Sequence, residues 1–162
     1  MVDATGYTLL QNTFDAWYRV VQQTDAAGKT LTIAYDTPTA GVTSVTDPEG
    51  GVSRYYFDAY QRTTDWVAPT GQVTSYLYDA VGNLQKVIDG GAGEWNFGYD
   101  ANGNLLNSQD PLGNPMLFTY NPQQLPTTIT DARSNVTTFA YDANRNMISM
   151  TDPVMAMTLP VN

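Results

Sequence analysis

One spacing constrains the fold of this chain more than any other feature. An aromatic residue followed by Asp or Asn returns at steps of 21, 22, 21, 21, 21 and 21 residues. A fixed period of this size is typical of repeat proteins, in which each unit buries apolar side chains against its neighbours. We therefore expect residues 1–162 to form one array of seven repeats, degenerate from about residue 153. The aromatic positions are Phe14, Tyr35, Phe57, Tyr78, Tyr99, Tyr120 and Tyr141.

Each repeat contains two turn motifs, separated by short runs rich in β-branched and aromatic residues. One motif is Asp-Pro-x-Gly or a close variant, in which Pro pre-sets φ, Asp bonds the following backbone and Gly suits the fourth position. The other follows the aromatic residue and reads as a longer hairpin connection with Gly82 or Gly103 available for positive φ. The sequence thus predicts an all-β, antiparallel meander of about fourteen short strands, curled or spiralling into part of a shell.

The fourth position of the turn after the aromatic varies between repeats. Where Gly82 and Gly103 stand, other repeats carry a residue with a side chain. If this position is left-handed, each such replacement costs roughly 1–2 kcal/mol. We expect those turns either to relax or to be weaker. The replacing residues are Tyr18, Gln61, Gln124 and Arg145.

The strand that leads into each aromatic residue alternates as a half-buried strand does. Residues two apart share one face, as in Tyr76 and Tyr78 or Phe97 and Tyr99. Stacked repeats should therefore line up their large side chains as an aromatic ladder on one face. The return strand is less regular, because its apolar residues stand three apart. Either a β-bulge or burial on both faces would explain the spacing. The pairs are Leu84 and Val87, Val42 and Val45, and Met147 and Met150.

Composition excludes several classes of function. The chain has no Cys and no His, which removes thiol chemistry, His bases and Cys or His metal sites. Its formal net charge of −9 disfavours nucleic acid and anionic membrane surfaces. No apolar run approaches the roughly 18 residues of a membrane helix. Residues 1–6 lack the basic region and apolar core of a signal peptide. We expect no cofactor, no membrane insertion and no enzymatic activity.

Two rows of acidic residues are the remaining candidates for chemistry. Equivalent carboxylates of adjacent repeats lie two strands apart, roughly 10 Å, whereas calcium needs its oxygens at about 2.3–2.6 Å. We therefore favour the interpretation that each Asp caps its own turn, over weak calcium binding or glycosidase-type catalysis. The acids that follow the aromatics act as structural repeat anchors in this interpretation. They are Asp15, Asp36, Asp58, Asp79, Asp100 and Asp142.

Trp17 and Tyr60 stand in turns, where a buried role is not obvious. An exposed aromatic ring can stack on a sugar, so both residues are candidates for glycan contact. This alternative makes the chain a carbohydrate-binding or adhesion module on the same repeat scaffold.

The motif is similar to the RHS repeat, also called the YD repeat. Tyr78–Leu84 and Tyr99–Leu105 read Tyr-Asp-Ala-x-Gly-Asn-Leu, and the resemblance covers nearly the whole chain. It implies a β-ribbon that spirals into a hollow shell, as in bacterial polymorphic toxins, toxin-complex proteins, wall-associated proteins and teneurins. It further implies a non-catalytic module of a secreted or surface protein. Partners implied are the rest of a larger chain, self-association through sheet edges, or a toxin cargo.

Overall fold

The computed structural model describes residues 10–152, which form fourteen β-strands and no helix. Residues 1–9 and the expected degenerate end from residue 153 lie outside the described part. Residues 10–152 contain no helix long and apolar enough to cross a membrane. The strands are β1 (Leu10–Phe14), β2 (Val20–Asp25), β3 (Thr30–Tyr35), β4 (Val42–Thr46), β5 (Val52–Phe57), β6 (Thr63–Val67), β7 (Val73–Tyr78), β8 (Leu84–Ile88), β9 (Glu94–Tyr99), β10 (Leu105–Gln109), β11 (Pro115–Tyr120), β12 (Pro126–Thr130), β13 (Val136–Tyr141) and β14 (Met147–Thr151).

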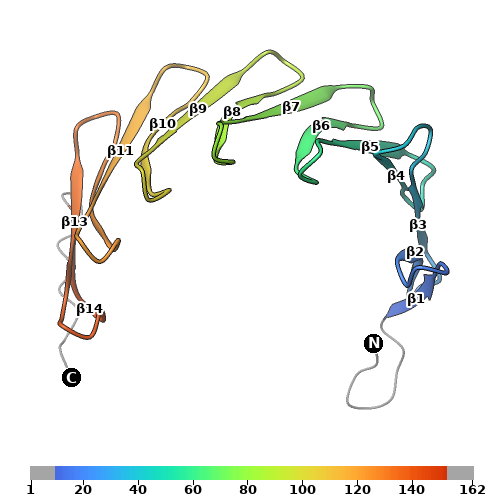
Figure 1. Cartoon of the computed structure of the whole chain (residues 1–162), viewed down its shortest axis with the longest axis horizontal. Helices are drawn as coiled ribbons and strands as arrows, with labels where there is room; N and C mark the ends of the chain where they lie inside the picture. Colours follow the sequence, from blue (N-terminus) through green and yellow to red (C-terminus); the bar gives the residue numbers. More distant parts are fainter. Residues whose placement is uncertain (1–9, 153–162) are drawn as a thin grey trace. The chain divides into compact units, whose positions relative to one another are not determined.

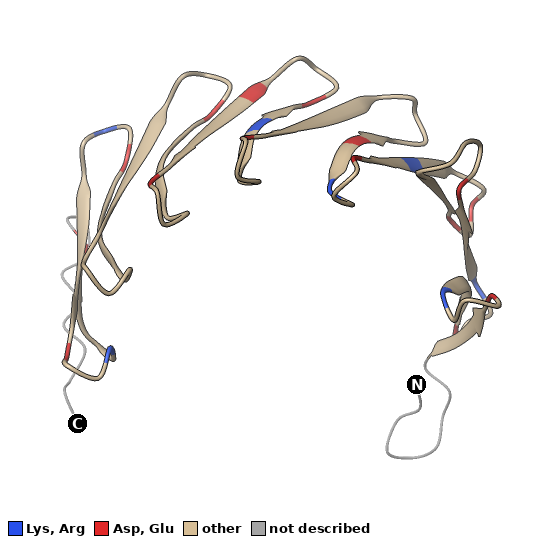
Figure 2. Cartoon of the chain, in the orientation of Figure 1, with Lys and Arg blue, Asp and Glu red and all other residues tan. Residues whose placement is uncertain are grey.

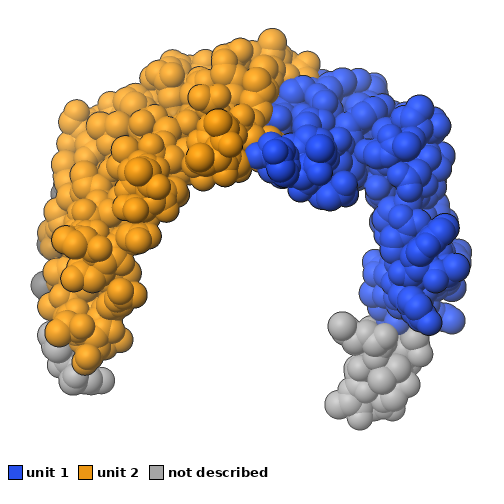
Figure 3. Space-filling model, viewed as in Figure 1, with its two compact units in different colours: residues 1–76 blue, residues 77–162 orange. Residues whose placement is uncertain are grey.

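The chain divides into two units, residues 1–76 and 77–162, with the boundary inside β7 (Figure 3). In the first unit each strand from β1 to β7 pairs antiparallel with the next. In the second unit the same holds from β8 to β14. The sheet within each unit is bent rather than flat (Figure 1). The predicted antiparallel meander is therefore confirmed, whereas one array over all 162 residues stays a prediction.

Twelve connections between strands share one five-residue turn. Its first residue donates its N–H to the carbonyl of the fifth, and its fourth donates to the carbonyl of the first, as in Asp100, Gly103 and Asn104 at 2.9 and 3.1 Å. This is the hairpin loop built from a type I turn and one left-handed residue. The expectation of two different turns was wrong: the Asp-Pro-x-Gly turns, such as Asp110 to Asn114, have the same hydrogen bonds.

The fourth residue of these turns is left-handed whether or not it is Gly. Gly103 has a φ of 82°, and the residues with side chains at this position keep positive φ. These turns therefore do not relax, and each non-Gly residue carries the cost of the left-handed conformation, roughly 1–2 kcal/mol. The values are 60° at Tyr18, 62° at Gln61, 64° at Ala92, 63° at Gln124, 65° at Ser134 and 69° at Arg145.

A β-bulge explains most of the irregular return strands. In the last pair, Tyr141 lies opposite Met147 and Phe139 lies opposite Met150, because the register shifts between Ala140 and Tyr141. The bulge adds one residue on β14, so two methionines three apart face the same side. The same shift occurs between β1 and β2, β5 and β6, β9 and β10, and β11 and β12.

One connection departs from this pattern. The segment from Asp36 to Gly41 has one residue more than the other turns, and β3 pairs with β4 without a register shift. Val45 lies opposite Ile33 on the ladder face, so Val42 points to the other face. Of the two explanations for the three-residue spacing, burial on both faces applies here, because Val42 is only 3% exposed.

The sheet of each unit has little core of its own. Among the described residues, Val42 is the one buried hydrophobic side chain, and no side chain is less than 2% exposed. The ladder residues Phe118, Phe139 and Tyr141 are half-buried, while their neighbours Thr119 and Ala140 on the other face are exposed. The ladder face is thus the better covered face of a single layer.

Candidate functional site

The carboxylates cap their own turns. In the turn that starts at Asp100, Oδ1 accepts the N–H groups of Asn102 and Asn104, both at 2.9 Å, and Oδ2 accepts Nδ2 of Asn104 at 2.9 Å. The hydrogen bond from the Asn104 side chain, followed by that from its backbone, lowers the pKa of Asp100 below its usual 3.8. We call this arrangement the Asn clasp. It recurs as Asp79 with Asn83, Asp110 with Asn114, Asp131 with Asn135, and Asp142 with Asn146.

Two turns of the first unit use Arg in place of Asn. Asp58 Oδ1 accepts the N–H groups of Tyr60 and Arg62, and the Arg62 guanidinium donates to Oδ2 at 2.7 Å. Asp15 is held in the same way by Arg19. Desolvation raises the pKa of both carboxyl groups, but the backbone and guanidinium hydrogen bonds outweigh it and the pKa is lowered.

The acids are therefore occupied by their own turns. Figure 2 shows most Asp and Glu residues at turns and strand ends of both units. Within residues 10–152, no three acidic residues gather in a way that could hold a metal ion. Asp36 is the exception among the repeat anchors: it has a φ of 55° and its Oδ1 accepts the N–H of Gly41 at 3.0 Å across the longer turn.

The aromatic ladder is tied to the backbone by its hydroxyl groups. Tyr35 donates to the carbonyl of Val20 at 3.0 Å, and Tyr120 donates to the carbonyl of Leu105 at 2.9 Å. Each bond joins the end of one strand to the start of the strand before it. Burial, and then the nearby Asp79 carboxylate, raises the pKa of Tyr99. The role of the aromatics as repeat anchors stays a prediction.

Trp17 and Tyr60 occupy the third position of the two Arg-clasped turns. They are 75% and 80% exposed. The guanidinium of Arg19 lies 5.1 Å from the Trp17 ring centre, and that of Arg62 lies 5.1 Å from the Tyr60 ring centre. One face of each ring is therefore occupied by a cation from its own turn. The sequence analysis did not predict this stacking. The signal for it was an Arg two residues after each aromatic residue.

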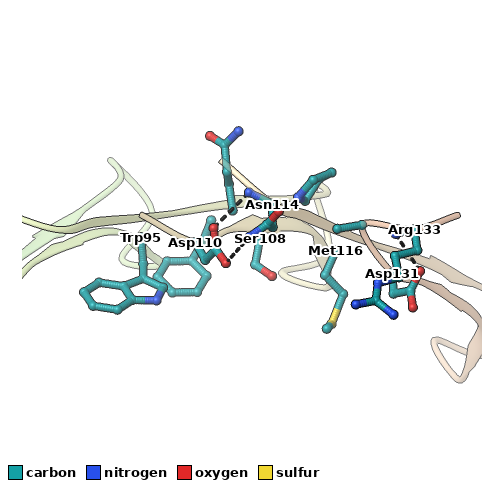
Figure 4. A pocket seen from close by; sticks show the side chains of 11 residues that line it. Trp95, Ser108, Asp110, Asn114, Met116, Asp131 and Arg133 are labelled. Atoms are coloured by element: carbon teal, nitrogen blue, oxygen red, sulfur yellow. Dashed lines mark hydrogen bonds between the residues drawn. The ribbon is translucent and has the colours of Figure 1, made fainter. Parts of the chain in front are cut away.

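A hollow of about 540 Å³ lies on the ladder face of the second unit. The side chains of Trp95, Ser108 and Met116 point to the same side, with Arg133 and Asp131 beyond Met116 (Figure 4). Its volume falls within the range of small-ligand sites, roughly 300–1,000 Å³. The sequence analysis did not predict this hollow. The signal was Ser108, a small residue at a position that is large in most repeats.

The signature of the RHS Repeat family matches four overlapping windows, residues 57–94, 78–115, 99–135 and 120–154, which together cover more than half of the chain. No curated protein matches the chain.

Two solved structures are similar in fold. One is titled "Crystal Structure of TcdB2-TccC3-Cdc42", with a TM-score of 0.70 and 15% identity over 93% of this chain and 9% of that chain. The other is titled "Crystal Structure of TcdB2-TccC3 without hypervariable C-terminal region", with a TM-score of 0.57 and 14% identity over 93% of this chain and 10% of that chain. This chain therefore spans about a tenth of these structures.

Proposed function

Because the chain belongs to the RHS repeat family, we propose that it is a structural, non-catalytic module of a β-shell that encloses or presents a toxin or another client protein. The observation that carries this proposal is the aromatic ladder. It concentrates large apolar side chains on one face of a sheet that covers almost none of them fully. Exposed apolar surface of this kind is stabilised when another protein segment covers it.

The proposal assigns the chain a place in a larger protein. The similar structures are about ten times longer than the part that this chain spans. We expect either the remainder of a longer RHS chain or a second copy to pair with the outer strands, because an unpaired strand edge offers N–H and C=O groups to another chain. By its family, the module belongs to a secreted or cell-surface protein. Its acidic character argues against a nucleic-acid partner.

Light scattering coupled to chromatography, together with binding of a dye that reports apolar surface, tests this proposal. We expect self-association or strong dye binding by the isolated chain. A strictly monomeric chain that binds no dye would contradict the proposal, because a self-sufficient sheet needs neither a client nor a continuing shell.

We propose carbohydrate binding on the same scaffold as the second candidate function, because Trp17 and Tyr60 expose aromatic surface in turns at the ends of the strands. A glycan array with Trp17→Ala and Tyr60→Ala tests it. Asn102→Ala, at the same turn position in the second unit, is the matched control. If glycan binding is present and both aromatic substitutions leave it unchanged, this function is wrong.

A further inference from the structure

Ser108 opens the hollow on the ladder face because it is small. In other repeats the corresponding residue of the return strand lies opposite a ladder residue and fills the space beside it: Val45 opposite Ile33, Trp66 opposite Tyr55, Ile129 opposite Phe118, and Met150 opposite Phe139. Ser108 lies opposite Phe97 on one side and Met116 on the other. Because Ser108 has no larger side chain, its hydroxyl group is surrounded by apolar side chains that nothing fills in between.

We propose that this hollow binds an aromatic side chain of an extended client segment that carries a Lys or Arg next to that residue. The site is formed by Trp95, Phe97, Ser108 and Met116, with Asp110 and Asp131 at its rim. The inference rests on the proposed function only in taking the ladder face as the surface that meets a client.

The walls of the hollow favour an aromatic ring over a sugar. Trp95, Phe97 and Met116 supply flat and adaptable apolar surface, and thioether sulfur contacts aromatic rings favourably. A sugar needs several free polar groups, but both oxygens of Asp110 are occupied, by two backbone N–H groups and by Nδ2 of Asn114. Met116 is 41% exposed, so its side chain has surface left to cover.

The charge around the hollow favours a basic neighbour on the client. Two carboxylates, Asp110 and Asp131, line the hollow against one guanidinium, Arg133. The chain as a whole has a net charge of −9. A cation beside the bound ring gains from this field, and the indole face of Trp95 is itself a favourable surface for a cation.

Methyl NMR of the whole chain with labelled methionine tests the proposal. The probe is the tetrapeptide acetyl-Gly-Phe-Lys-Gly-amide, and the Met116 methyl signal is assigned by its loss in Met116→Leu. We expect a saturable shift of this signal, with a dissociation constant in the millimolar range. In Ser108→Leu the added side chain fills the hollow and should weaken binding by at least about tenfold. The substitution suits the fold, because Ile129 occupies the corresponding position.

Matched controls separate the site from general effects. Thr130→Leu adds the same side chain to the opposite face of β12 and should leave binding unchanged. The peptide with Ala in place of Phe should not shift Met116. A peptide with Glu in place of Lys should bind more weakly than the Lys peptide. Asp131→Asn should reduce this difference in affinity by about twofold. The turn that starts at residue 131 should persist, because in the equivalent turn Asn121 accepts the N–H groups of Gln123 and Leu125, both at 3.0 Å.

Equal binding of the Phe and Ala peptides, or unchanged binding by Ser108→Leu, would overturn the inference. This outcome is distinguishable from failure of the proposed function, because peptide binding requires no association of the chain. If the chain self-associates but does not bind the peptide, the proposed shell function still stands and only the proposed site is wrong.

Discussion

The turn after Phe57 in the first unit and the turn after Tyr99 in the second unit have the same backbone but different side-chain clasps. Arg62 holds Asp58 at 2.7 Å and lies over Tyr60, whereas Asn104 holds Asp100 at 2.9 Å with no aromatic partner. The shared elements are an acceptor at the first position and a left-handed fourth residue. These two turns therefore share their first and fourth positions and differ at the third and fifth positions.

The longer segment from Asp36 to Gly41 departs from this shared turn. One added residue removes the bulge that other return strands carry and turns Val42 to the opposite face. Ser44, on the same face, donates to the carbonyl of Thr37 at 2.7 Å, so the segment folds back toward the strand that follows it. An insertion in the turn has thus produced a small local core in a sheet that otherwise lacks one.

Acid should have the largest effect on the clasped turns. The pKa values of Asp79, Asp100 and Asp142 are lowered in the folded chain, chiefly by hydrogen bonds from the Asn side chains. Groups with depressed pKa stabilise the fold above their unfolded pKa, about 3.9, and lose that contribution as pH falls through the folded value. We expect this contribution to be constant above about pH 5 and to be lost progressively below about pH 4.

The turn that starts at Asn121 provides the internal control for acid, because its cap is an amide that does not titrate. Hydrogen exchange of Gln123 and Leu125 should respond less to acid than that of Asn102 and Asn104 at the same turn positions. Equal loss of protection in both turns while the rest of the sheet stays protected would show that the carboxylates do not set local stability.

Val42→Ala should have the next largest effect. Val42 is 3% exposed, and removing two methyl groups from a buried site costs about 2 kcal/mol. Val81→Ala is the control in a regular turn, where the side chain is 85% exposed and the change should cost less than about 0.5 kcal/mol. Urea unfolding measures both. Similar costs would mean that the longer segment adds no core.

Substitutions at the fourth turn position should change the stability of the chain in opposite directions. Gln124→Gly should stabilise the chain and Gly103→Ala should destabilise it, each by about 1 kcal/mol, because only Gly adopts positive φ without strain. A Cβ at Gly103 would meet only Asn83 Oδ1 at 3.7 Å, an ordinary contact, so backbone strain is the expected cause. Thermal unfolding measures both. Destabilisation by Gln124→Gly would show that its side chain has a role of its own.

Arg62→Gln should have the smallest effect. The Arg62 and Asp58 side chains are 29% and 22% exposed, so solvent still screens this ion pair, and both backbone hydrogen bonds of Asp58 remain. We therefore expect the melting temperature to fall by less than about 2 °C. Asn104→Ala is the matched change in the second unit. A much larger loss for Arg62→Gln alone would mean that its stacking on Tyr60 stabilises the first unit.

Sequence reasoning predicted the strands and the common face of the aromatic residues, because the 21-residue period and the two-residue alternation are both visible in the chain. It could not choose between a bulge and burial on two faces, because Val42 with Val45 and Met147 with Met150 have the same spacing. The difference lies in turn length, which sets the register.

The candidate sites were predicted less completely than the fold. The exposure of Trp17 and Tyr60 follows from their turn position, and the Arg two residues later hints at a partner, but only the folded turn shows that the guanidinium lies over the ring. The hollow at Ser108 depends on which residues lie opposite it across two strands. That information is not in the local sequence of any one strand, although comparison of the repeats in register makes Ser108 stand out.

The most direct test of the common aromatic face is the position of two methyl groups. Nuclear Overhauser contacts should join the Met147 methyl to the Tyr141 ring and the Met150 methyl to the Phe139 ring, because the bulge places both methionines on the ladder face. If one methionine instead contacts Ala140 and neither ladder ring, β14 is a regular strand and the ladder account is contradicted.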